Sequence, residues 1–131
     1  MKTLLILLFS ILQITGCAVA DNPKNVVSQY LKAIDNFQFD KAKSLLIKDP
    51  ENLKAFDDIR TFSESFNETK KRESILRAKN RVYNIIDKEI TKDTALIIAT
   101  NNEGSFTALI TFEMIKQNGK WLIKSFKTDI G

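Results

Sequence analysis

The sequence predicts an α+β domain in which three N-terminal helices pack on one face of a curved, four-stranded antiparallel sheet. Apolar residues recur at helical spacing up to about residue 72, and from residue 80 onward they alternate with polar residues as in strands. All the helical segments precede all the strand segments. This order favours one layer of helices on one antiparallel sheet.

The helices have recognisable starting points. Asn22-Pro23 is an N-cap residue followed by proline at the first helical position, and Pro50 is expected to begin the third helix in the same way. Asp40 is the expected N-cap of a short second helix. The apolar stripe of the third helix ends near Arg72, and residues 74–79 either extend that helix or turn.

Four strands follow, separated by polar turns. They are expected at residues 81–90, 94–100, 106–116 and 120–127. The turns between them are expected at residues 91–93, 101–105 and 117–119, the last a tight turn that contains Asn-Gly. The pattern therefore predicts a meander of neighbouring strands.

The first residues have the layout of an export signal. An uncharged apolar run follows Lys2 and ends at Ile14, which is shorter than the roughly twenty residues that a membrane span needs. The segment Ile14-Thr15-Gly16-Cys17 resembles the bacterial lipobox, which implies cleavage between Gly16 and Cys17 and attachment of lipid to the Cys17 sulfur. The expected organisation is a lipoprotein signal peptide at 1–16, a lipidated cysteine and short tether at 17–22, and one domain at 23–131.

A second export route competes with this one. Ala18-Val19-Ala20 also suits a signal peptidase, and cleavage after Ala20 would release a soluble secreted or periplasmic protein. The lipid anchor is favoured because Cys17, the only cysteine, stands where the lipobox needs it. Ala18 is not the aspartate typical of inner-membrane retention, so we expect the outer membrane where the cell has one.

Composition excludes several kinds of site. The chain has no histidine, which excludes Ser-His-Asp and Cys-His nucleophilic sites and histidine-bearing zinc sites. Its net charge of +4 is too mild to indicate a nucleic-acid partner. We expect no metal and no cofactor.

Three segments of the chain resemble nuclear transport factor 2-like domains. They are VVSQYLKAIDNFQFDKAKSLL at 26–46, KDTALIIAT at 92–100 and NGKWLIKSF at 118–126. The resemblance implies a cone-shaped space between the helices and the sheet, and within this group the nearest likeness is to small bacterial envelope lipoproteins. Because the group contains both enzymes and non-catalytic binding proteins, the fold alone does not assign an activity.

The cone could hold a small apolar ligand. The residues expected to line it are Tyr30, Ile34, Phe56, Phe62, Phe66, Phe106, Ile110, Phe112 and Trp121. The simpler interpretation is that these side chains pack together as core, since a small domain needs most of its apolar side chains for stability. No carboxylate accompanies Tyr30 on the predicted inner side, so no catalytic residue is assigned.

Two surfaces are candidate contacts for partners. A basic segment could meet anionic lipid headgroups, or it could simply favour the negative end of a helix dipole; its residues are Lys70, Lys71, Arg72, Arg77, Lys79 and Arg81. The outer face of the sheet is unusually apolar for a solvated face and could bind a second copy or another protein; its residues are Leu96, Ile98, Leu109, Ile115, Leu122 and Phe126. These features favour a membrane-anchored, non-catalytic binding or interaction module. An immunity or accessory lipoprotein is the alternative, and an isomerase- or hydrolase-type enzyme is less favoured.

Overall fold

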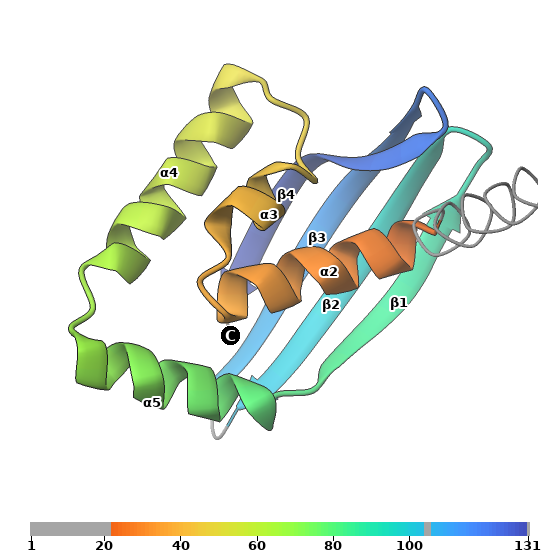
Figure 1. The fold of residues 1–131 in the computed structure, drawn as a ribbon. Coiled ribbons are helices and arrows are strands. Elements are labelled where there is room, and N and C mark those ends of the chain that lie inside the picture. Colours follow the sequence, from red (N-terminus) through yellow and green to blue (C-terminus); the bar gives the residue numbers. More distant parts are fainter. Residues whose placement is uncertain (1–21, 104–105, 131) are drawn as a thin grey trace, which may run out of the picture.

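The computed structural model describes residues 22–103 and 106–130 and confirms the α+β class (Figure 1). The described helices are α2 (Pro23–Asp35), α3 (Phe39–Lys43), α4 (Pro50–Glu64) and α5 (Glu68–Lys79). The strands are β1 (Tyr83–Ile90), β2 (Thr94–Glu103), β3 (Phe106–Gln117) and β4 (Lys120–Ile130). They form one antiparallel sheet in the order β1-β2-β3-β4, and α2 crosses one face of it. We call the helix-covered side of the sheet the inner face and the other side the outer face.

The predicted starts of two helices are confirmed. The side chain of Asn22 accepts a hydrogen bond of 2.9 Å from the Lys24 amide, and Pro23 opens α2. Asp49 likewise accepts a 2.8 Å bond from the Asn52 amide at the start of α4. In both helices a polar cap precedes a proline whose missing N–H needs no partner.

The prediction of one long third helix is wrong. α4 ends at Glu64, and α5 begins at Glu68 and runs in a different direction across the end of the sheet (Figure 1). The side chain of Asn67 accepts a 2.8 Å bond from the Lys70 amide and so caps the start of the new helix. The described residues therefore form four helices instead of the three expected.

The second helix also differs from its prediction. α3 starts after Gln38, so Asp40 lies inside the first turn and is not the N-cap. Beyond this helix, Leu46 forms a parallel bridge with Ile123 of β4. The Ile47 amide donates to the Ile123 carbonyl at 2.8 Å, which covers the free edge of β4 with residues 45–47.

The strand meander is confirmed, with two bulges that the alternation did not reveal. The β1–β2 register shifts between Asp87 and Glu89, and the β3–β4 register shifts opposite the step from Glu113 to Met114. The predicted turn between β3 and β4 has Asn118 at φ 52° and Gly119 at φ 77°, which is the backbone of a two-residue hairpin turn.

One core lies between the inner face and the helices. Its sheet residues are Ala95, Ile97, Ala99, Phe112, Met114, Trp121 and Ile123, and its helix-side residues are Val26, Val27, Tyr30, Leu31, Ala33, Ala42, Leu46 and Phe56. None of the helices in the described part of the chain is long and apolar enough to cross a membrane.

Phe126 lies on the inner face, so its predicted place on the outer face is wrong. Its ring centroid is 5.8 Å from that of Tyr30 and 6.4 Å from that of Phe112. Ile123 pairs with Met114, whereas Ser125 pairs with Glu113, so Lys124 is the extra residue of a bulge. The extra residue shifts the alternation by one and turns Phe126 inward.

Candidate functional site

The structure brings most of the predicted cone residues together on the inner side. Tyr30, Phe56, Phe112 and Trp121 are buried in the core, and Ile34 and Ile110 pack partly buried against it. Phe66 is half-buried, whereas Phe62 is 67% exposed. Phe106 begins β3, but its side chain lies outside the described part of the structure.

Tyr30 is the most unusual of these residues. Its ring meets Phe112 edge-on at a centroid distance of 5.9 Å, yet its hydroxyl is buried and has no hydrogen-bond partner among the described residues. Burial raises the pKa of the Tyr30 hydroxyl above its usual range, so the group remains a proton donor. An unsatisfied buried polar group costs about 1–3 kcal/mol, which a hydrogen-bond acceptor brought by water or a ligand would offset.

A second buried polar atom for which the described residues offer no partner belongs to the same face. Asn101 follows Ile97 and Ala99 at the alternate positions of β2 that point to the helices, and its Oδ1 is buried without a hydrogen-bond partner in the described part of the chain. This atom accepts hydrogen bonds, whereas the Tyr30 hydroxyl also donates them. Within the described residues, the Tyr30 hydroxyl is thus an unused donor and Asn101 Oδ1 an unused acceptor on the inner face.

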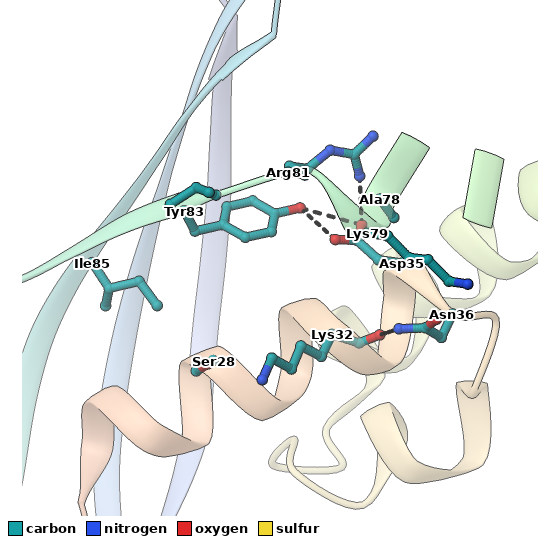
Figure 2. A pocket seen from close by; sticks show the side chains of 10 residues that line it. Ser28, Lys32, Asp35, Asn36, Ala78, Lys79, Arg81, Tyr83 and Ile85 are labelled. Carbon is teal, nitrogen blue, oxygen red and sulfur yellow. Dashed lines mark hydrogen bonds and ion pairs between the residues drawn. The ribbon is translucent and has the colours of Figure 1, made fainter. Parts of the chain in front are cut away.

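A separate pocket of about 380 Å³ opens between α2, the end of α5 and the beginning of β1 (Figure 2). Tyr83 and Ile85 line it from β1, and Ser28 and Lys32 line it from α2. Lys79 contributes from the end of α5. Both polar and apolar side chains therefore line this opening, which we call the α2–β1 pocket.

A largely buried ion pair closes one end of the α2–β1 pocket. Arg81 Nη1 donates to Asp35 Oδ1 at 2.7 Å, and the two side chains are only 16% and 13% exposed. The Tyr83 hydroxyl donates to the same carboxylate, 3.0 Å from Oδ2 and 3.2 Å from Oδ1 (Figure 2). Burial, and then the charge of Asp35, raise the pKa of Tyr83 to about 12. The phenol therefore stays protonated and donates near neutral pH.

Sequence reasoning missed this cluster. Asp35 and Tyr83 were not singled out, and Arg81 was assigned only to the basic segment. The one local signal is the alternation of Tyr83 with Ile85 along the predicted strand, which indicates that both face the helices. Nothing local identifies Asp35 as the partner of Arg81, because the two are 46 positions apart.

The residues of the basic segment lie in several different environments. Lys70 Nζ lies 4.5 Å from the Phe66 ring centroid, and Lys71 Nζ lies 5.3 Å from that of Phe37. Lys79 lines the α2–β1 pocket. Arg81 is the partner of Asp35 described above. Arg72 and Arg77 are exposed on α5.

A row of five phenylalanine rings joins α4 to the end of α2. Successive ring centroids are 6.3, 5.9, 6.2 and 5.3 Å apart along Phe56, Phe39, Phe37, Phe66 and Phe62. A hollow of about 280 Å³ lies against the middle three rings. The row becomes more exposed along its length, since Phe56 is fully buried and Phe62 is not.

The outer face carries the other predicted partner surface. Five of its predicted residues alternate with buried inner-face residues and are half-buried; they are Leu96, Ile98, Leu109, Ile115 and Leu122. Ile86 of β1 pairs with Ile98 and adds a further aliphatic side chain. Glu89, Glu113 and Lys124 border a shallow hollow of about 190 Å³ on this side.

Neither a scan of protein-family models nor a search of curated protein sequences finds a match to this chain.

Proposed function

We propose that this chain is a bacterial envelope lipoprotein whose nuclear transport factor 2-like domain is a non-catalytic binding module for a small, largely apolar molecule. The lipobox-like segment ending at Cys17 supports the anchor, and the α+β fold with all described helices before the strands agrees with the resemblance. Membrane lipid attached to Cys17 is thus the first proposed partner.

The hydroxyl of Tyr30, which has no hydrogen-bond partner among the described residues, is the observation that carries the binding proposal. It lies inside an apolar core next to Phe112 and Phe126, where an unused donor is costly. A ligand that enters between the helices and the inner face gains affinity if it brings one acceptor to this hydroxyl. The rest of such a ligand contacts aromatic and aliphatic side chains, so its class is apolar with one polar group.

The position of the first described helix supports placement close to the membrane. α2 begins at Pro23 with its cap at Asn22, so residues 18–22 separate Cys17 from the domain. Such a tether reaches roughly 17 Å even when fully extended. A lipidated Cys17 therefore keeps the binding module near the lipid surface, and the outer membrane is favoured where one exists.

Native mass spectrometry tests the binding proposal. The chain from residue 22 onward is incubated with a bacterial envelope lipid extract, and its mass is compared with that of Tyr30→Phe and of the control Tyr83→Phe. We expect an adduct of defined mass on the wild type and the control, with lower occupancy on Tyr30→Phe. A bare protein in all three samples contradicts the proposal.

The anchor is tested independently by Cys17→Ala in the full-length chain. We expect the wild type in the membrane fraction with a diacylated mature N-terminus, and the variant in the soluble fraction or unprocessed. An unchanged membrane fraction and N-terminus in the variant contradicts the lipoprotein proposal, whatever the ligand experiment shows.

The outer face favours a second candidate, an immunity or accessory lipoprotein that works through a protein partner or as a homodimer. Its half-buried aliphatic side chains are not covered by any described helix. Sedimentation equilibrium of the wild type and Ile98→Glu tests the homodimer, since the added charge should convert a dimer to a monomer. An enzyme is the least favoured candidate, because the Tyr30 hydroxyl has no hydrogen-bonded base among the described residues.

A further inference from the structure

The two edges of the sheet differ in whether another described segment pairs with them. Residues 45–47 cover the edge of β4, where backbone bonds of 2.8 and 2.9 Å join them to Ile123. On the opposite edge, β1 pairs with β2 only, and no other described strand lies beside it. An edge strand turns alternate N–H and C=O groups outward, ready to pair with another chain.

Only one half of the β1 edge carries the features that prevent such pairing. The second half contains the bulge between Asp87 and Glu89 together with the charged Lys88. Bulges and charges are the devices by which proteins block exposed edges. The first half, Tyr83–Ile86, pairs regularly with β2 and carries no charged side chain.

The unblocked half of β1 lies beside the α2–β1 pocket. Tyr83 and Ile85 line this pocket, with Ser28 and Lys32 of α2 opposite them (Figure 2). Two further apolar side chains are exposed on or next to this stretch: Ile86 is 49% exposed, and Val82, directly before Tyr83, is 81% exposed. An open edge and a pocket for alternate side chains are the two parts of a site for an added strand.

We propose that Tyr83–Ile86 binds an extended peptide segment of another protein as a further strand of the sheet. Every second side chain of this peptide enters the α2–β1 pocket, where an apolar residue contacts Ile85 and the Tyr83 ring. The proposal goes beyond the small-molecule function, since it uses a different surface from the Tyr30 region.

The charges of the pocket favour an acidic peptide over a second copy of the chain. Lys32 and Lys79 are exposed at its rim, and the carboxylate of Asp35 already accepts from Arg81 and Tyr83. An acidic side chain in the peptide complements the two lysines. A second copy paired through the same edge would bring the same basic rim into the interface.

A phage-displayed library of random peptides is the probe for this site. Selection is made on the chain from residue 22 onward, which contains every described helix and strand. We expect enriched peptides in which apolar residues alternate with acidic ones. Lys32→Glu should weaken their binding about tenfold or more, whereas the matched control Lys127→Glu on β4 should leave it within about twofold.

Two further readouts separate strand addition from other modes of binding. Methylation of successive backbone nitrogens in a selected peptide should abolish binding at every second position, because only alternate amides pair with β1. Amide exchange of the protein should slow within residues 83–86 when the peptide is added. No enrichment, equal binding to Lys32→Glu, or insensitivity to methylation overturns the proposal. Slowing that depends on protein concentration without peptide shows instead that a second copy occupies the edge, and it overturns the proposal too.

Discussion

Arg81 Nη1 lies 2.7 Å from Asp35 Oδ1, and this ion pair fastens the last residue of α2 to the segment that enters β1. The Tyr83 hydroxyl donates to the same carboxylate, so three residues from two distant segments share one anchor point. Since α2 crosses the sheet while β1 is an edge strand, the anchor holds the edge of the sheet against the helical layer (Figure 1).

Breaking this ion pair should destabilise the protein. Asp35→Ala leaves Arg81 and the Tyr83 hydroxyl without that acceptor in a mostly buried place, and we expect a loss of about 2–3 kcal/mol in the free energy of unfolding. Urea denaturation of Asp35→Ala, Arg81→Ala and the double variant Asp35→Ala/Arg81→Ala measures the coupling between the two residues. The double variant should lose less free energy of unfolding than the sum of the two single losses. The exposed pair Lys54–Asp58 is the control, because its removal should cost less than about 0.5 kcal/mol.

Tyr83 should titrate late in alkaline solution. Its folded pKa of about 12 exceeds the unfolded value of 10.0, because burial and then the charge of Asp35 disfavour the phenolate. The stability that it contributes is therefore complete below pH 10 and is lost as the pH rises toward 12. The pKa of Tyr83 is measured by following the near-ultraviolet absorbance of the phenolate against pH in Tyr30→Phe, in which Tyr83 is the single tyrosine.

A second variant tests whether the charge of Asp35 raises the pKa of Tyr83. In Tyr30→Phe/Asp35→Asn the negative charge is gone, so the Tyr83 phenolate should appear at lower pH than in Tyr30→Phe alone. An unchanged titration curve would show that the Asp35 carboxylate does not act on Tyr83.

Removing the Tyr30 hydroxyl should stabilise the unliganded domain. Tyr30→Phe keeps the ring contacts with Phe112 and Phe126 and deletes a buried group that no described residue pairs with, so we expect a gain of about 1 kcal/mol. Thermal unfolding of the two proteins checks this, and a loss of similar size would mean that the hydroxyl has a partner in solution. Stabilisation combined with weaker ligand binding is the behaviour expected of a residue kept for binding.

Asn52 should be important for the shape of β4. Its Nδ2 donates to the carbonyls of Ile47 and Lys124, both at 2.8 Å, and the residue is buried. Lys124 is the bulge residue, so Asn52 supplies a partner for the carbonyl that the bulge displaces. Asn52→Asp removes both donors and should cost about 2–3 kcal/mol. Asn52→Asp is compared in urea with the exposed control Asn36→Asp, and an equal effect of the two changes would contradict this role.

The sequence predicted what depends on local spacing and missed what depends on distant partners. The caps at Asn22 and before Pro50, the change of period near residue 80 and the Asn118-Gly119 turn are all local signals, and each is confirmed. The bulge at Lys124 lies in the pairing of β4 with β3, and the Lys124 carbonyl accepts from the distant Asn52, so alternation alone put Phe126 on the wrong face. The sequence does contain a local signal for the start of α5, since asparagine before glutamate is typical of a helix start. The apolar stripe continues on both sides of Asn67, and it led to the prediction of a single helix.

The candidate sites divide in the same way. Helical spacing was enough to place Tyr30 on the inner side of α2, because only one face of an amphipathic helix is apolar. Helical spacing could not show that its hydroxyl finds no partner in the described structure, because that depends on how β3 and β4 pack against α2. The ion pair of Asp35 with Arg81 likewise could not be predicted, because folding brings together two residues that are 46 positions apart in the sequence.

Phe37 has a backbone conformation that is unfavourable for a residue with a side chain, and contacts of its ring offset the cost. It follows the end of α2 with φ 60°, and the Gln38 amide donates to the Ala33 carbonyl at 2.8 Å, as in helix ends that usually carry glycine. The left-handed conformation costs a side-chain-bearing residue about 1–2 kcal/mol. Contacts of the ring with Phe39 and Phe66, and Lys71 above its face, offset this cost.

Two substitutions of Phe37 separate these opposing effects. Phe37→Ala loses the ring and keeps the backbone strain, whereas Phe37→Gly loses the ring and relieves the strain. We therefore expect both to be less stable than the wild type in urea, with Phe37→Gly more stable than Phe37→Ala by about 1 kcal/mol. Equal stability of the two would mean that this backbone is not strained in solution. A glycine variant as stable as the wild type would instead mean that the ring contacts do not stabilise the fold.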